Sequence, residues 1–112
     1  RVDHSLEAEN ILKNAYENVT PYQLDIYESA YFEWDNTPRY RRYSKIFTPL
    51  SNVEMKDKLL KLLKKSIENQ SPYVFFNAWN EWSESAYLEP DENNKYEKLE
   101  IIKDVLTNVE KL

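Results

Sequence analysis

The stretch YVFFNAW, residues 73–79, is almost continuously apolar and leads into a polar segment. A strand with one face in water alternates apolar and polar residues, whereas a strand covered on both faces does not. The stretch therefore predicts a central strand of a parallel sheet. Residues 26–34 (IYESAYFEW) are rich in aromatics and predict a second strand, and residues 35–38 (DNTP) predict the loop that follows it.

Three amphipathic helices are predicted around these strands. Residues 5–18 predict the first, because apolar residues recur there at near-helical spacing. Ser51 and Glu54 predict the start of the second, since they have the spacing of a capping box, in which each side chain satisfies an N–H group of the first turn. Asn94 and Glu97 have the same spacing and predict the start of the third. The apolar residues expected to line one side of the second and third helices are Met55, Leu59, Leu62, Leu63, Ile67, Leu99, Ile102, Leu106 and Val109.

Strands that alternate with helices are typical of βαβ units, so the sequence predicts the α/β class. A parallel sheet needs more than two strands. We therefore expect the remaining strands to come from sequence outside these 112 residues or from a partner chain.

The composition argues against several classes of function. The formal net charge is −5, which disfavours a nucleic-acid partner, because a phosphate backbone is bound by clustered Lys and Arg. Cysteine is absent and His4 is the single histidine, so we expect no thiolate or multi-histidine metal site. Glycine is absent too, which excludes the glycine-rich loops that cradle nucleotide phosphates. No stretch approaches the roughly 20 apolar residues of a membrane span. We expect no metal, no cofactor and no membrane span.

The candidate chemistry lies directly after the apolar strand, in residues 77–91 (NAWNEWSESAYLEPD). In α/β sheets and barrels, the loops after the carboxyl ends of strands carry the active site. Glu81 and Glu84 are three residues apart, and in a turn or short helix their Cβ atoms would approach within about 5–6 Å. Glycosidic chemistry commonly uses two carboxyl groups at a controlled separation. The structural alternative is a surface acidic loop, which a bare ExxE pattern favours.

Residues 77–91 resemble the signature of the WbsX-like family, bacterial glycosyltransferases of polysaccharide biosynthesis. That family is similar to glycoside hydrolase family 99, the endo-α-mannosidase group. Residues 34–39 (WDNTPR) resemble a second signature of the family, and the two motifs stand in the expected order. The resemblance covers roughly residues 26–106. It implies a (β/α)8 TIM-type barrel, of which residues 1–112 would be a C-terminal fragment.

The resemblance also implies roles for individual residues. The first glutamate of NEWxE, matched by Glu81, would assist the sugar 2-hydroxyl that attacks the anomeric carbon. The second, matched by Glu84, would be the general acid/base. The residues that would contact substrate are Trp34, Asp35, Asn36, Arg39, Asn80, Trp82 and Glu89. For the WDNTPR loop the structural alternative is turn chemistry, with Arg39 paired to a carboxylate. Ser85 departs from the family, which usually has glycine there, and glycine suggests a special backbone angle or a close approach of substrate.

Three functions remain open on the sequence. The first is an enzyme that makes or cleaves glycosidic bonds in an oligosaccharide or polysaccharide. We expect this enzyme to be inactive as an isolated fragment and, by analogy with its relatives, cytoplasmic. The second is a non-catalytic carbohydrate-binding or structural remnant of such a barrel. The third is an interaction module built on the lysine-rich second helix.

Overall fold

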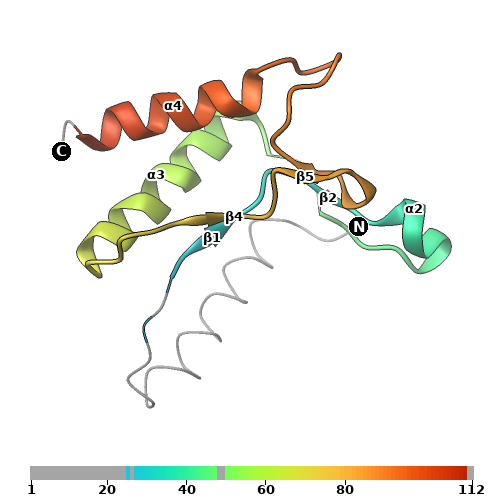
Figure 1. Ribbon diagram of the computed structural model, residues 1–112, viewed down its shortest axis with the longest axis horizontal. Helices are drawn as coiled ribbons and strands as arrows, with labels where there is room; N and C mark the ends of the chain where they lie inside the picture. Colours follow the sequence, from blue (N-terminus) through green and yellow to red (C-terminus); the bar gives the residue numbers. More distant parts are fainter. Residues whose placement is uncertain (1–24, 26, 48–49, 111–112) are drawn as a thin grey trace.

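The computed structural model describes residues 25, 27–47 and 50–110. Their fold is mixed α/β, with short strands paired in twos and two long helices (Figure 1). The predicted helix over residues 5–18 and His4 lie outside the described residues. The described elements, in chain order, are β1 (Ser29–Ala30), β2 (Trp34–Asp35), α2 (Thr37–Tyr40), η2 (Arg41–Tyr43), β3 (Ile46–Phe47), α3 (Asn52–Glu68), β4 (Phe75–Phe76), β5 (Asn80–Glu81), η3 (Trp82–Glu84), β6 (Ala86–Tyr87) and α4 (Glu97–Glu110).

The two predicted strand regions pair in parallel. Strand β1 lies beside β4 with Ser29 opposite Phe75 and Ala30 opposite Phe76. The N–H of Phe75 donates to the Glu28 carbonyl at 3.0 Å, and the pairing continues beyond the strand ends. Both strands are shorter than the sequence predicts. The region 26–34 is not one strand, because β2 starts at Trp34 and turns to pair antiparallel with β3.

Helix α3 is the crossover between the parallel strands, and its predicted start is confirmed. The Ser51 Oγ accepts from the Glu54 N–H at 3.3 Å, while the Glu54 carboxylate accepts from the Ser51 N–H at 2.9 Å. Met55 and Leu59 are buried, as predicted, but Ile67 is 58% exposed. Towards the end of α3 the buried position is Ser66 rather than the predicted Ile67.

The predicted cap of α4 is wrong, and its predicted inner face is only partly right, because Ile102 packs against the core while Leu106 does not. Asn94 donates to the Asp91 carboxylate through its N–H and its side chain, while the Glu97 carboxylate accepts from the Asn52 amide on α3. The most buried face carries Lys98, Ile101 and Val105, and the predicted Leu106 is 49% exposed. Adjacent apolar stripes on a helix differ little in the sequence, and packing against α3 selects between them.

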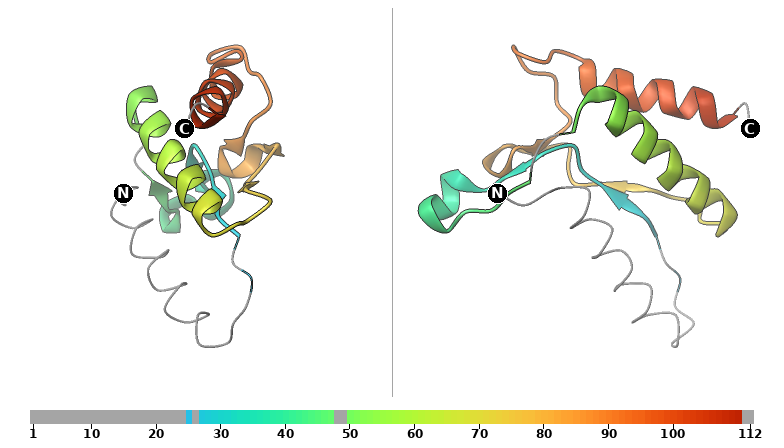
Figure 2. Two further views of the ribbon diagram at one scale, coloured as in Figure 1. Left: turned by 90° about the vertical axis from the view of Figure 1, so that its left-hand side faces the viewer. Right: turned by 180° about the vertical axis from the view of Figure 1, so that it is seen from behind.

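The core lies between α3, α4 and one side of the β1–β4 pair. Figures 1 and 2 show both helices on that side of the strands. Its buried side chains are Phe32, Met55, Leu59, Ile101 and Val105.

Within residues 27–47 and 50–110, the predicted coverage of the 73–79 strand is found on one face only. Phe76 packs against the core and stacks on Phe32, with ring centroids 6.0 Å apart. Phe75, on the other side, is 56% exposed, and Tyr73 and Trp79 are exposed as well. The described residues place their helices on one side of this strand only. Among these residues, no helix is both long and apolar enough to cross a bilayer.

Candidate functional site

The WDNTPR segment forms a braced loop between β2 and β3. Asn36 is buried, and its side-chain oxygen accepts the Lys45 N–H at 2.6 Å across the loop. The Asp35 carboxylate accepts the Thr37 N–H at 2.9 Å, which closes the turn as Asx residues commonly do. Pro38 stands in the first turn of α2, where its fixed φ favours a helix start. These contacts fix the direction in which the Arg39 side chain projects from α2.

The NEWSE segment forms a second tight turn. Strands β5 and β6 pair antiparallel, with Glu81 opposite Ala86, and the 3₁₀ turn η3 joins them. Ser85 closes the turn with φ 54° and ψ 17°, in the left-handed region that favours glycine. This is the position at which the family resemblance suggests glycine. Serine keeps the turn geometry here, at a cost of about 1–2 kcal/mol for a left-handed residue that has a Cβ.

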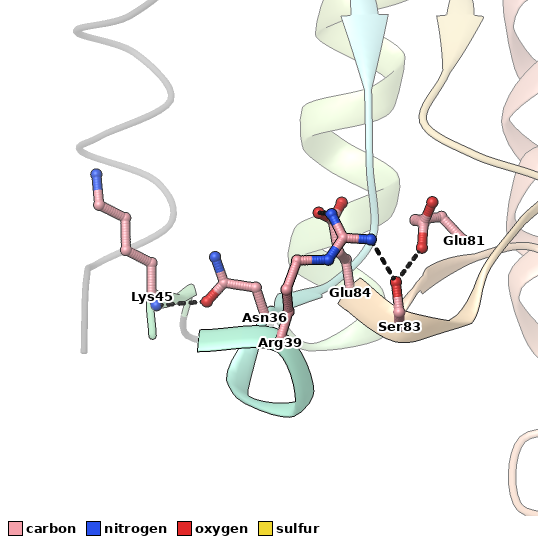
Figure 3. A network of polar contacts seen from close by, with 6 residues as sticks. All are labelled: Asn36, Arg39, Lys45, Glu81, Ser83 and Glu84. Carbon is pink, nitrogen blue, oxygen red and sulfur yellow. Dashed lines mark hydrogen bonds and ion pairs between the residues drawn. The ribbon is translucent and has the colours of Figure 1, made fainter. Parts of the chain in front are cut away.

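The two loops meet through a chain of polar contacts that joins both glutamates (Figure 3). Arg39 Nη1 lies 3.2 Å from Glu84 Oε1, and Arg39 Nη2 donates to Ser83 Oγ at 3.3 Å. Ser83 Oγ in turn donates to Glu81 Oε1. We call Arg39, Glu81, Ser83 and Glu84 the carboxylate network. Arg39 pairs with Glu84, Ser83 bonds Glu81, and the bond from Arg39 to Ser83 links the two carboxylates in one chain of contacts rather than leaving them splayed into solvent.

The members of the network differ in exposure. The Glu84 side chain is 15% exposed, whereas that of Arg39 is 52% exposed. The Glu84 carboxylate is therefore covered by a cation that a ligand could reach from solvent.

A second feature stands directly beside the network. The Trp82 ring stacks on Tyr87 with ring centroids 3.7 Å apart and an interplanar angle of 13°. Lys98 Nζ also lies over the Tyr87 ring, 3.8 Å from its centroid. This buried ammonium donates to the Tyr87 carbonyl at 2.9 Å. We call Trp82, Tyr87 and Lys98 the aromatic column. Cation–π and stacking contacts of this kind hold a ring in one orientation.

Asp91 anchors the aromatic column. Its carboxylate accepts the Tyr87 hydroxyl at 2.6 Å and the Asn94 N–H at 2.5 Å. Burial and the bond to Asp91 raise the pKa of Tyr87 to about 12. The bonds from Tyr87 and Asn94 lower the pKa of Asp91 to about 2, because they stabilise its ionised form.

The other predicted substrate-binding residues lie around this centre without joining the network. Trp34 is in β2, with its ring edge-on to Tyr31 at 6.2 Å. Asn80 is exposed in β5, and Glu89 follows β6 half-buried. Among the described residues, the Asn80 and Glu89 side chains form no hydrogen bond with the carboxylate network. No group of three or more His, Asp or Glu side chains in that same part of the chain is arranged to hold a metal ion.

Sequence reasoning missed three residues of this region. Ser83 could have been found, because a hydroxyl between two glutamates in a tight turn is well placed to bond one of them. Lys98 gave no local signal, since its contacts join α4 to β6. Tyr87 has partners nearby in the chain, Trp82 and Asp91, but the spacing of these residues does not by itself indicate a contact.

Comparison with known proteins places the chain in a family. The family model described as Glycosyltransferase WbsX matches residues 2–102, which include both loops of the site. The chain belongs to this family of glycosyltransferases, and so to a family of carbohydrate-active proteins. The similarity of this family to glycoside hydrolase family 99 stays a prediction.

The curated relatives are much longer than the matched segment. The chain is 36% identical over 77 residues to the uncharacterized protein WxcX from each of two strains of Xanthomonas campestris pv. campestris. The match covers 66% of this chain and 11% of WxcX. No solved structure matches the chain.

Proposed function

We propose that the chain carries the catalytic carboxylates of an enzyme that makes or cleaves glycosidic bonds, acting in the metabolism of a bacterial surface polysaccharide in the cytoplasm. The observation that supports this most is the carboxylate network. Glu81 and Glu84 are bonded to neighbouring groups of one constellation, with Glu84 largely withdrawn from solvent. A surface acidic loop would hold its carboxylates apart in water, where their mutual repulsion is smallest.

The position of the carboxylate network relative to the parallel strands β1 and β4 supports the same proposal. The Trp34–Arg39 loop follows β1, and the Glu81–Glu84 loop follows β4. Because β1 and β4 are parallel, both loops leave the same end of the pair, as Figure 1 shows. Active sites of parallel α/β folds lie at that end. We therefore propose that these residues form a C-terminal fragment of a (β/α)8 barrel, whose other strands come from sequence outside this chain.

The proposed roles are those that the resemblance to glycoside hydrolase family 99 implies for the two glutamates. Glu84, protonated, gives its proton to the leaving oxygen as the bond from that oxygen to the anomeric carbon breaks. Glu81 accepts the proton of the sugar 2-hydroxyl as that oxygen bonds to the anomeric carbon. Arg39 and Ser83 are positioning residues, because they hold the two carboxylates and need not touch the reacting atoms.

Substitution of each glutamate by glutamine in the intact protein tests this function. Glu84→Gln and Glu81→Gln should each lower turnover by about 10²–10⁴-fold, the usual contribution of acid–base catalysis, while sugar binding is retained. Glu100→Gln, an exposed glutamate of α4, is the matched control and should leave turnover unchanged. Turnover that survives both site substitutions would contradict the assignment. Sugar binding without any turnover in the unaltered protein would favour the non-catalytic remnant.

A further inference from the structure

A shallow depression of about 500 Å³ opens beside the carboxylate network. Its lining residues are Trp82, Pro90, Asp91, Glu92, Lys95 and Tyr96. None of the four network residues lines it, but Trp82 stands next to both Glu81 and Ser83 in the chain. The depression is thus separate from the carboxylates and contiguous with them through one aromatic residue.

The aromatic floor of the depression is pre-organised. Trp82 is 47% exposed even though one ring face rests on Tyr87, and it lines the depression. The aromatic column and Asp91 hold that ring in place from behind. Tyr96, 62% exposed, adds a second aromatic ring from the start of α4.

The rim of the depression is a braced turn. The Lys95 N–H donates to the Asp91 carbonyl at 2.9 Å, and the Asp91 carboxylate holds the Asn94 N–H. Tyr96 follows directly, and its carbonyl accepts the first helical N–H of α4, from Glu100, at 2.9 Å. Tyr96 therefore projects from backbone that is fixed by hydrogen bonds, and the Trp82 carbonyl likewise accepts the Ser85 N–H at 3.2 Å, which lowers the entropy lost when a ligand binds.

We propose that this depression is a binding subsite for a neutral pyranose unit, next to the unit that lies at the carboxylate network. The C–H faces of a pyranose pack on aromatic rings, and its hydroxyl groups bond polar side chains such as those on the rim. Asp91 and Glu92 outweigh Lys95 in charge, so the subsite selects against uronic acids and other anionic sugars. The inference rests on the proposed function for the identity of the ligand as a sugar.

The test is a binding series on the intact protein carrying Glu84→Gln, so that turnover does not consume the probe. The probes are α-linked mannose and glucose oligosaccharides of one to four units, measured by calorimetric titration. Tyr96→Ala should weaken binding of the tetrasaccharides about tenfold and that of the monosaccharides far less, because loss of one stacking ring removes about 1.4 kcal/mol. Tyr96→Phe retains the ring and should retain most of the affinity.

A control variant and an independent measurement separate this proposal from the proposed function. Tyr43→Ala removes an exposed tyrosine far along the chain from the depression and should not change binding. As a measurement that leaves the depression unaltered, the indole N–H resonance of Trp82 should shift with tetrasaccharide in the protein that carries Glu84→Gln alone. Equal loss for all chain lengths, or full affinity in Tyr96→Ala, would overturn the subsite while leaving the glutamate assignment in place. Failure of every oligosaccharide to bind would overturn both.

Discussion

Tyr87 links three features of the site. Its ring lies between Trp82 and Lys98, and its hydroxyl bonds Asp91. Tyr87→Phe keeps the ring but removes the hydroxyl. We expect the pKa of Asp91 to rise from about 2 toward its ordinary 3.8, because the Tyr87 hydrogen bond is the largest cause of the lowering. Carbon-13 NMR titration of the Asp91 carboxyl measures this change directly.

The same contact sets the pH range in which it stabilises the fold. The lowered pKa of Asp91 means that its contribution is present above about pH 3.8 and is lost as the pH falls through about 2. The raised pKa of Tyr87 means that its contribution is present below pH 10.0 and is lost as the pH rises through about 12. Tyr43→Phe, at an exposed tyrosine, is the control. An Asp91 pKa unchanged in Tyr87→Phe would show that the hydroxyl does not stabilise the carboxylate.

At the scale of residues, the sequence predicts what depends on local spacing. The separation of Glu81 and Glu84 places both in one tight turn, and Ser85 takes the backbone angle that the family glycine suggests. The pairing of Arg39 with a carboxylate, foreseen as the structural alternative for its loop, is the contact that joins the two loops. It does not decide between a structural and a functional Arg39, because one guanidinium can do both.

Alanine substitutions of two serines at opposite ends of α3 should change the free energy of unfolding in opposite directions. Ser51→Ala removes the N-cap bond and should destabilise the intact protein by about 1 kcal/mol. Ser66 is buried near the other end, and its hydroxyl has no hydrogen-bond partner among the described residues. Ser66→Ala should therefore stabilise the protein by up to about 1 kcal/mol, because an unmet polar group is removed and alanine favours helix.

Thermal or denaturant unfolding of both variants measures the contrast. The chemical change is the same at both positions, so each variant controls for the other. A clear destabilisation by Ser66→Ala would show that this hydroxyl has a partner that the described residues do not supply.

The two long helices also show where prediction of elements fails. Both partners of the α3 capping box are local, so the sequence predicts the start of that helix correctly. The start of α4 instead depends on Asp91, which holds Asn94, and on Asn52, which binds Glu97 from 45 residues away. The spacing of Asn94 and Glu97 carries no information about these competing partners. The most buried face of α4 is likewise set by contact with α3.

At the scale of the molecule, the residues that the structure describes cover the β1–β4 pair on one side only. Phe76 faces α3 and α4, while Phe75 faces away and packs with Tyr27 and Tyr73, at centroid distances of 6.0 and 6.4 Å. Parallel sheets are normally covered on both faces. The apolar pattern of residues 73–79 predicts such coverage, and the described residues supply half of it. In the proposed barrel, helices form the outer ring, so the Phe75 side would face the barrel interior.

This orientation can be tested at Phe75. If the proposed barrel encloses that side chain, Phe75→Ala should destabilise the intact protein by about 3–5 kcal/mol, the cost of deleting a buried phenyl ring. If the side chain stays as exposed as it is here, the cost should be below about 0.5 kcal/mol, as for ordinary surface substitutions. Denaturant unfolding measures the difference, and Tyr43→Ala, at an exposed ring on η2, controls for loss of an aromatic side chain. A surface-like response at Phe75 would contradict the barrel, because a parallel strand that ends at an active site would then have one face in water.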